Sequence, residues 1–322
     1  MTALLTEAPA GTRTLLVQQA SWEADGVLSL RLVDPDGAAL PPWTPGAHVD
    51  LVLPSGLVRQ YSLCGDPGDR SAYLVAVRRE PAGRGGSAEV HATALVGATL
   101  GVRGPRNRFE LVDAPRYLLL AGGIGITPLL PMLAELRRRG RPCELWYGGR
   151  DRASMPFVDQ LRRLHPDGVH VVPQDEYGLL DVAGLTAAAA PGTAVYCCGP
   201  EGLLRAAEAA CGGLDLHVER FAATAPPAEP AAVGGAFEVE LCRSGVVAPV
   251  APDQTVLDAV RAAGADVLSS CEEGFCGTCE VRVLDGEPEH HDAILSAAER
   301  ERGETMMICV SRCRSPRLVL DL

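Results

Sequence analysis

The sequence predicts a multidomain chain: an antiparallel β-barrel, then a doubly wound α/β domain, then a small α+β domain. Three observations support this fold class. Residues 1–112 contain short apolar runs with period-two alternation, a pattern typical of antiparallel strands. Residues 113–225 alternate continuous apolar strands with helical patterns, which indicates a parallel sheet. A Pro/Ala/Gly-rich linker at 226–235 then precedes a third domain over 236–322, in which cysteines cluster.

Composition excludes several classes of protein. The chain has 322 residues and a net charge of −12, whereas nucleic-acid binding needs a basic surface. It shows no basic leader segment and no apolar run of the ~18 residues that a membrane span requires. Its 11 cysteines form an odd set without a secretory signal, so we expect reduced thiols, a cytoplasmic location and no membrane contact.

One strand of the first domain combines a cation, an aromatic ring and a hydroxyl. It reads Arg59-Gln60-Tyr61-Ser62-Leu63 and lies among expected strands at 14–17, 27–32, 48–53 and 73–77. Arg59 and Tyr61 share a face because side chains alternate along a strand. A flavin fits this set, because its ring can stack and its phosphate can meet the cation. Ordinary strand packing and a solvated arginine would give the same pattern.

A glycine-rich turn in the same domain suggests an anion site. The segment Gly83-Arg-Gly-Gly-Ser87 runs into a helical pattern that continues through Leu95. Backbone N–H groups in such a turn bind phosphate, and Ser87 is placed to cap the helix and touch the phosphate. A flexible basic loop is the alternative.

The second domain opens with a strand, a glycine-rich turn and a helix. The strand at 116–121 leads into Gly122-Gly-Ile-Gly-Ile-Thr-Pro128 and a helix over 129–138. This order is the setting of a nucleotide pyrophosphate site, although it lacks the G-x-G-x-x-G fingerprint. Pro128 fits the first helical turn.

Further alternation places three glycine-rich turns at one edge of the predicted sheet. We expect strands at 142–147, 169–172 and 194–198, and helices at 155–164 and 203–210. The turns at 122–125, 148–149 and 199–202 then follow strands, and ligands bind at the carboxyl ends of parallel strands. Cys198 opens the last turn, where it is either a thiol beside a nicotinamide or a small buried residue.

The third domain should form a mixed sheet with one packed helix. Strands are expected at 237–241, 245–250, 280–286, 308–310 and 318–320, and a helix at 255–263. Two adjacent histidines, His290 and His291, are expected in a surface turn because neighbouring residues rarely share a ligand face.

Four cysteines carry the strongest chemical signal. Cys271, Cys276 and Cys279 are spaced C-x4-C-x2-C, and Cys309 follows after a long gap. This is the plant-type ferredoxin spacing for a [2Fe–2S] cluster. Gly274 and Gly277 in the loop permit unusual backbone angles. Inert core cysteines are the alternative, and zinc is disfavoured because its loops use two matched cysteine pairs.

In this order, these motifs resemble the phthalate dioxygenase reductase family, which includes vanillate demethylase reductase subunits. The resemblance covers essentially the whole chain and rests on the motifs above together with Gly104-Pro-Arg-Asn-Arg-Phe109, Cys198-Gly-Pro200 and Glu219-Arg-Phe221. It implies an FMN-binding β-barrel over 1–112, an NAD(P)-binding domain over 113–225, and a β-grasp-like plant-type [2Fe–2S] ferredoxin domain over 236–322. The residues alone do not separate FMN from FAD.

The resemblance also implies roles for individual residues. Ser62, Thr127 and Cys198 would line or orient the reacting rings, and Cys271, Cys276, Cys279 and Cys309 would hold the cluster. The implied cofactor-binding residues are Arg59, Gln60, Tyr61, Ser62, Ala76, Val77, Arg78, Gly85, Gly86, Ser87, Gly122, Gly123, Gly125, Thr127, Pro128, Arg150, Cys198, Gly199, Pro200 and Phe221. NADH is the expected donor, with NADPH left open by Arg150 and Arg152.

We therefore expect a monomeric NADH-dependent reductase that passes electrons through FMN and a [2Fe–2S] cluster to a separate oxygenase. A Rieske-type oxygenase is the first expectation for the partner, and a haem-thiolate monooxygenase is the second. A stand-alone flavin or ferric reductase and an iron–sulfur redox sensor are the competing functions. Glu272, Glu273 and Phe275 lie between cluster ligands, which predicts docking to a basic partner surface that salt weakens.

Overall fold

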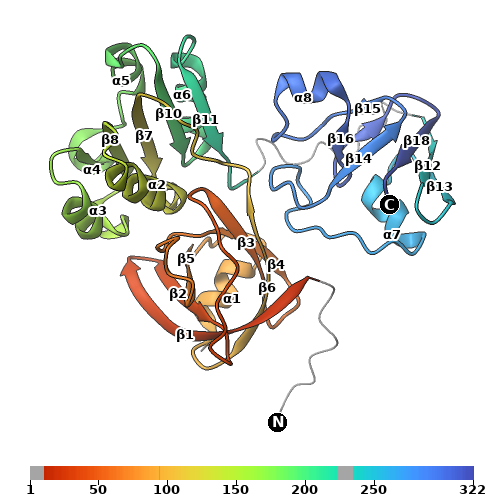
Figure 1. Cartoon of the computed structure of the whole chain (residues 1–322), viewed down its shortest axis with the longest axis horizontal. Coiled ribbons are helices and arrows are strands. Elements are labelled where there is room, and N and C mark those ends of the chain that lie inside the picture. The colour runs from red at the N-terminus through yellow and green to blue at the C-terminus, as the bar shows by residue number, and fades with distance from the viewer. Residues whose placement is uncertain (1–10, 94, 223–234) are drawn as a thin grey trace. The chain divides into compact units, whose positions relative to one another are not determined.

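The computed structural model describes residues 11–93, 95–222 and 235–322. The chain divides into two compact units, Met1–Arg220 and Phe221–Leu322 (Figure 1). The first unit holds an antiparallel and a parallel sheet, and the second holds a mixed sheet. Within the described part of the chain, no helix has the length and apolar character of a membrane span. The predicted linker lies outside the described residues except for Gly235, so the predicted domain limits stay predictions.

Six antiparallel strands form the first sheet, in the order β4-β3-β6-β1-β2-β5. A bridge between Leu63 and Val75 connects its two outer strands, so the sheet closes on itself. Its interior is a continuous apolar core that includes Leu15, Val49 and Val77. The strands are β1 (Thr12–Ala24), β2 (Val27–Val33), β3 (Ala47–Val52), β4 (Val58–Ser62), β5 (Ala72–Arg78) and β6 (Thr99–Asn107), and α1 (Gly86–Ala92) follows β5.

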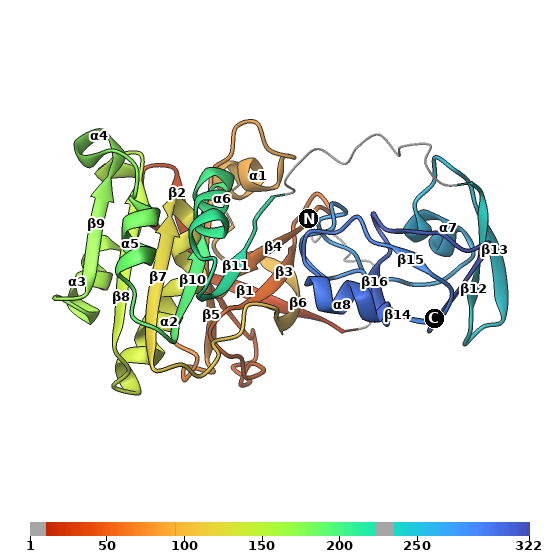
Figure 2. The same ribbon diagram turned by 90° about the horizontal axis from the view of Figure 1, so that it is seen from above.

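The second sheet is parallel, with strand order β11-β10-β7-β8-β9 (Figure 2). Alternate residues of its strands pack into two different cores. Leu119 in β7 belongs to the core shared with α2, and Leu118 belongs to the core shared with α5 and α6. The elements are β7 (Arg116–Gly122), η1 (Gly123–Gly125), α2 (Ile126–Arg138), β8 (Cys143–Gly149), η2 (Arg152–Ser154), α3 (Val158–Leu164), β9 (Val169–Pro173), α4 (Gln174–Tyr177), α5 (Val182–Ala188), β10 (Thr193–Cys198), α6 (Glu201–Ala210) and β11 (Asp215–Glu219).

Element boundaries differ from expectation where the backbone turns tightly. Helix α2 begins at Ile126, before the predicted start, because the glycine turn itself coils into η1. Helix α3 begins later than predicted because Phe157 adopts a left-handed conformation with φ 65°. Helix α5 and strand β11 were not predicted, since their short segments carry weak periodicity.

The second unit contains a five-stranded sheet in the order β13-β12-β18-β14-β16 and a two-stranded β15-β17 ribbon. The predicted strand at 308–310 is wrong. Those residues form a turn, in which the N–H groups of Val310 and Ser311 both donate to the carbonyl oxygen of Met307. The elements are β12 (Phe237–Leu241), β13 (Val246–Val250), α7 (Val256–Ala262), β14 (Glu280–Asp285), β15 (Pro288–Glu289), α8 (Ala297–Arg302), β16 (Thr305–Met307), β17 (Arg312–Cys313) and β18 (Arg317–Leu320).

Helix α8 is a second helix where only one was predicted. A capping box starts it: Ser296 accepts from the Glu299 N–H, and the Glu299 side chain accepts from the Ser296 N–H. This signal was present in the sequence as Ser-x-x-Glu. The short length and polar surface of the helix hid it from a search for apolar periodicity.

Candidate functional site

Two glycine-rich turns meet at the carboxyl edge of the parallel sheet. A Cβ atom on Gly125 would lie 2.2 Å from the carbonyl oxygen of Cys198, and one on Gly199 would lie 2.8 Å from the Gly122 Cα. Neither position has room for a side chain, which explains the glycines. Strand pairing therefore gathers the predicted nucleotide residues of both turns at one place.

The start of α2 lies at the same edge. The Thr127 hydroxyl, which is buried, donates to the carbonyl oxygen of Ile124 at 2.9 Å. This bond stabilises the turn rather than leaving the hydroxyl open, so Thr127 supports the site through the backbone. The 13-residue helix begins at this edge, where a pyrophosphate site was predicted; the Ile126 N–H itself donates to carbonyl oxygens of η1, so the anion site stays a prediction.

Ser62 from the antiparallel sheet meets two residues of the parallel sheet. Its hydroxyl donates to Oε2 of Glu219 at 3.4 Å, and the Cys198 thiol donates to the same oxygen at 3.9 Å. The parallel register of β10 and β11 sets Cys198 beside Glu219. Two of the predicted ring-orienting residues, Ser62 and Cys198, are thus joined by a carboxyl group.

Glu219 was not predicted as a site residue. Its position became evident only with strand β11, although the Glu-Arg-Phe motif that supports the resemblance contains it. Desolvation raises the pKa of Glu219 to about 8, while the hydrogen bonds from Ser62 and Cys198 act in the opposite direction. The residue as a whole is only half-buried. A carboxyl group with such a pKa can hold a proton near neutral pH.

The predicted phosphate turn of the antiparallel sheet is closely packed. A Cβ atom on Gly86 would lie 2.5 Å from Cγ of Arg59. Arg59 donates to the Arg84 carbonyl oxygen at 2.6 Å, so the cation is held against the turn that begins α1. Gly85 caps this helix with φ 85°. The expected cap by Ser87 is wrong, because Ser87 lies inside the helix and its hydroxyl accepts from the Glu80 N–H.

The remaining predicted flavin residues occupy β4 and β5, the two strands that the closing bridge connects. Tyr61 packs against the core of the closed sheet, and desolvation raises its pKa to about 12. Ala76 and Val77 are buried, whereas Arg78 is exposed and pairs with Glu80 at 2.6 Å. Gln60 lies between Arg59 and Tyr61 on β4, partly buried.

Two predicted residues lie apart from these groups. Arg150 directly follows β8, at the carboxyl edge of the parallel sheet. Phe221 is the first residue of the second unit and is 40% exposed. Its predicted place against the flavin stays a prediction.

The second unit buries all four predicted cluster cysteines, Cys271, Cys276, Cys279 and Cys309. The Cys276 and Cys309 side chains lower the pKa of the Cys271 thiol, and Cys309 lowers the pKa of Cys279, while the same interactions raise the pKa of Cys276 and Cys309. These interactions link Cys271 with Cys276 and Cys309, and Cys279 with Cys309, which indicates that the thiols lie near one another. Among the described residues, no three His, Cys, Asp or Glu side chains gather as they would around a single metal ion. A [2Fe–2S] cluster needs no such group, because each iron takes only two protein ligands.

Backbone N–H groups of the ligand loop point at the thiols. The N–H of Glu273 donates to the sulfur of Cys271 at 3.3 Å, and the N–H of Thr278 donates to Cys276 at 3.5 Å. Gly274 and Gly277 have φ of 75° and 74°, as the predicted loop requires. Such N–H···S bonds stabilise thiolate charge and tune the potential of a cluster.

Asp292 stabilises the segment that contacts the ligand loop. Its fully buried carboxylate accepts from the N–H groups of Ile294 and Leu295 at 3.2 and 2.8 Å, and Arg300 lies 3.6 Å away. The Ala293 N–H donates to the Gly274 carbonyl oxygen at 2.9 Å. The loop is therefore held from outside by a short, fixed segment.

The two adjacent histidines have different surroundings. The expected surface turn is wrong for His290, whose side chain is buried and lies 3.5 Å from Asp292, whereas the His291 side chain is 48% exposed. Glu272 also differs from a free surface charge, because it pairs with Arg261 at 3.0 Å and accepts from Ser269.

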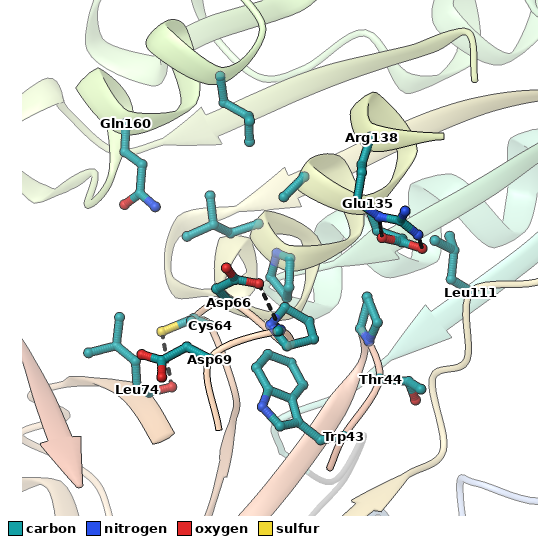
Figure 3. Close-up of a pocket in the computed structure, with 18 of the residues that line it drawn as sticks. Trp43, Thr44, Cys64, Asp66, Asp69, Leu74, Leu111, Glu135, Arg138 and Gln160 are labelled. Carbon is teal, nitrogen blue, oxygen red and sulfur yellow. Dashed lines mark hydrogen bonds and ion pairs between the residues drawn. The ribbon is translucent and has the colours of Figure 1, made fainter. Parts of the chain in front are cut away.

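A cavity of about 970 Å³ in the first unit is lined by none of the predicted site residues; Figure 3 shows the side chains around it. It is lined by Trp43 and Asp66 from the antiparallel part and by Leu130 and Arg138 from α2. Because it contacts α2 from Leu130 onward and not its first turn, it is separate from the edge of the parallel sheet where the glycine turns meet.

The glycine turns at the carboxyl edge of the parallel sheet lie beside the hydrogen-bonded Ser62, Glu219 and Cys198. The same chain carries a ferredoxin-type cysteine loop. Together these features define a flavin- and iron–sulfur-dependent oxidoreductase. The model of the "2Fe-2S iron-sulfur cluster binding domain" family matches residues 239–314. The solved phthalate dioxygenase reductase, described as a modular structure for electron transfer from pyridine nucleotides to [2Fe–2S], is 36% identical with a TM-score of 0.71, over 97% of this chain and 98% of that one. The chain belongs to the phthalate dioxygenase reductase family, as its sequence predicted.

Two other proteins are more similar in sequence. The phenoxybenzoate dioxygenase subunit beta of Ectopseudomonas oleovorans is 46% identical over the full length of both chains. An intact type IV self-sufficient cytochrome P450 monooxygenase of known structure is 45% identical with a TM-score of 0.91, over 99% of this chain. This chain spans only 43% of that monooxygenase.

Proposed function

We propose that this chain is the NADH-dependent reductase component of an oxygenase system, passing electrons through FMN and a [2Fe–2S] cluster to a separate oxygenase. The observation that carries the proposal is the meeting of Ser62, from the predicted flavin strand, with Cys198 and Glu219 of the nucleotide edge. A site built from both sheets suits hydride transfer, which requires two rings to be held face to face.

The chain's own residues position the reactants. The closed antiparallel sheet is the proposed flavin barrel within 1–112, where Arg59 and the Gly85-Gly86-Ser87 turn would hold the FMN phosphate; the tight Arg59–Gly86 packing supports this assignment. The parallel sheet within 113–225 would bind the dinucleotide along the start of α2. A bound flavin would supply hydride acceptance and single-electron donation, and a cluster held by the four cysteines would supply one-electron transfer.

Four buried thiols that shift one another's pKa support the assignment of Cys271, Cys276, Cys279 and Cys309 as cluster ligands. They lie in the β-grasp-like ferredoxin domain that we propose for 236–322. The N–H groups aimed at Cys271 and Cys276 would offset the negative charge of the reduced cluster. FAD in place of FMN is the remaining alternative for the flavin.

For the partner, we propose a terminal oxygenase of the Rieske type that binds a monomeric reductase in the cytoplasm. The relative named as a dioxygenase subunit supports this choice. One observation favours a haem-thiolate partner instead: the self-sufficient P450 contains a segment that is almost equally similar to this chain. The Glu273 and Phe275 surface of the ligand loop would dock on Lys or Arg side chains of either partner.

An anaerobic NADH titration of the purified protein tests the proposal. We expect the flavin absorbance to bleach and a rhombic [2Fe–2S] signal to grow in electron paramagnetic resonance. Bleaching without a cluster signal would refute the electron path. Acid release and chromatography of the flavin separates FMN from FAD.

The Cys271→Ser variant and the rate of NADH oxidation distinguish the competing functions. A stand-alone flavin or ferric reductase would reduce free flavin or iron equally well after Cys271→Ser, whereas we expect that variant to lose cytochrome c reduction. A redox sensor would oxidise no NADH at all.

A further inference from the structure

A cluster of charged residues lies at the carboxyl end of β8. None of these residues has a role in the proposed hydride transfer. Strand β8 ends at Gly149, and Arg150, Asp151 and Arg152 follow. Helix α4, which follows β9, adds Asp175 and Glu176. The Asp175 N–H donates to the Arg150 carbonyl oxygen at 3.1 Å, so the two segments are fixed to each other.

Within this cluster, Arg152 forms a bidentate salt bridge with Glu176. Its Nε lies 2.7 Å from Oε1 of Glu176, and its Nη2 lies 2.9 Å from Oε2. Two parallel N–H···O bonds match the planar guanidinium and give the pair a defined geometry. The hydrogen bond from Arg152 lowers the pKa of Glu176, so the carboxylate stays charged at neutral pH.

The position of this cluster corresponds to the adenosine ribose of a bound dinucleotide. In nucleotide-binding sheets, the strand beside the glycine-turn strand ends near the ribose 2′ position. Strand β8 is that neighbour here, since Gly148 pairs with Gly122 at the end of β7. Tyr177, next to Glu176, is 66% exposed, and an exposed aromatic ring offers a surface for a purine base.

We propose that Glu176 sets the preference of this chain for NADH over NADPH, by occupying Arg152 and keeping the ribose edge negative. This inference rests on the proposed function. The two segments at this edge carry three carboxylates (Asp151, Asp175 and Glu176) and two guanidinium groups (Arg150 and Arg152), so their formal charge is negative; Asp151 also caps η2 by accepting from the Ser154 N–H. A 2′-phosphate carries about two negative charges near neutral pH, so it would be repelled and would have to displace Glu176 to reach Arg152.

The size of the effect follows from the exposure of the pair. Both side chains are well exposed, at 44% and 39%, and exposed ion pairs are weak. Displacing Glu176 is therefore a modest barrier. We expect a discrimination of roughly five- to tenfold from this residue, and not the thousandfold effect of a buried charge.

The test measures kcat/KM for NADH and for NADPH with ferricyanide as acceptor, on the holoprotein. Glu176→Gln should raise the NADPH/NADH ratio of kcat/KM by roughly five- to tenfold. The double variant Glu176→Gln/Arg152→Gln should lose this gain, because Arg152 is the group released to bind phosphate. Glu135→Gln is the matched control: it removes another arginine-paired carboxylate, at the C-terminal end of α2, and should leave the ratio unchanged.

Direct binding gives an independent measurement. In calorimetry, 2′,5′-ADP should bind Glu176→Gln roughly five- to tenfold more tightly than wild type, while 5′-AMP binds both equally. Arg152→Gln alone should bind 2′,5′-ADP more weakly than the wild-type protein does. An unchanged NADPH/NADH ratio in Glu176→Gln, in a protein that oxidises NADH, would overturn the inference and leave the proposed function intact. A wild-type protein that oxidises neither nucleotide would overturn the proposed function itself.

Discussion

Glu219 joins the two sheets of the first unit through one carboxyl oxygen, which accepts from Ser62 and from Cys198. Ser62 and Cys198 could be selected from the sequence because each belongs to a recognisable motif. Glu219 could not, because its role depends on β11 pairing in parallel with β10. Residue types and spacing identify chemistry within a segment, and chemistry shared between segments appears only when strands are paired.

The raised pKa of Glu219 gives a prediction with a defined sign. Because this pKa rises from 4.5 to about 8 on folding, the folded protein binds the proton more tightly than the unfolded chain does. The contribution of Glu219 to stability is thus complete below about pH 4.5 and is lost as the pH rises to about 8. Replacing Glu219 by Gln should remove about 1–3 kcal/mol of the decline in unfolding free energy across this range.

Urea unfolding at a series of pH values measures this slope. Glu301→Gln, in which an exposed carboxylate of α8 is removed, should keep the wild-type slope. A Glu219→Gln protein with the wild-type slope would show that Glu219 titrates normally.

At the scale of elements, the contact between the two glycine turns leads to a second prediction. Gly125→Ala would force a Cβ atom to 2.2 Å from the Cys198 carbonyl oxygen. Relieving this clash requires backbone atoms to move, which is energetically costly. We expect a loss of about 1–3 kcal/mol of stability and a higher KM for NADH. Gly202→Ala is the control, because a Cβ atom there meets open space. Equal KM values in the two variants would contradict the predicted nucleotide edge.

The segment that holds the ligand loop provides a third prediction. Asp292→Ala removes the acceptor of two backbone N–H groups and the buried partner of Arg300. We expect it to cost about 2–4 kcal/mol in the second unit and to broaden the electron paramagnetic resonance signal of the reduced cluster. Asp285→Ala, at an exposed position of β14, should change neither. Loss of stability with an unaltered cluster signal would show that Asp292 does not help to position the ligand loop.

At the scale of the whole molecule, the net charge of −12 bears on the encounter with the partner. We expect reduction of the oxygenase to slow as salt rises from about 0.05 to about 0.5 M, because screening shortens the reach of surface charges. Stopped-flow kinetics with the purified oxygenase measures this dependence. Glu273→Arg should flatten it more than Glu238→Arg, which reverses a charge on β12 outside the ligand loop. The same response in both variants would show that net charge alone steers association.

The sequence predicted most of the architecture because its strongest signals are local. Period-two strands, continuous buried strands and glycine turns each reflect a short segment, and the four cysteines carry a known spacing. The misplaced strand at 308–310 and the overlooked α8 show the limit. A hydrophobic triplet in a turn resembles a strand, and a polar helix held by its cap has no apolar stripe.

The strand order of the second unit bears on how the protein matures. Strand β18 is last in sequence, yet it lies between β12 and β14 in the sheet and pairs with both. Until it docks, the β12–β13 hairpin and the β14–β16 pair have no strand between them, and closing that distance carries an entropic cost. Cys279 and Cys309 flank the β14–β16 pair in sequence. Because β14 pairs directly with β16, we expect these two ligands to approach each other before β18 docks, and the sheet beside them to close last.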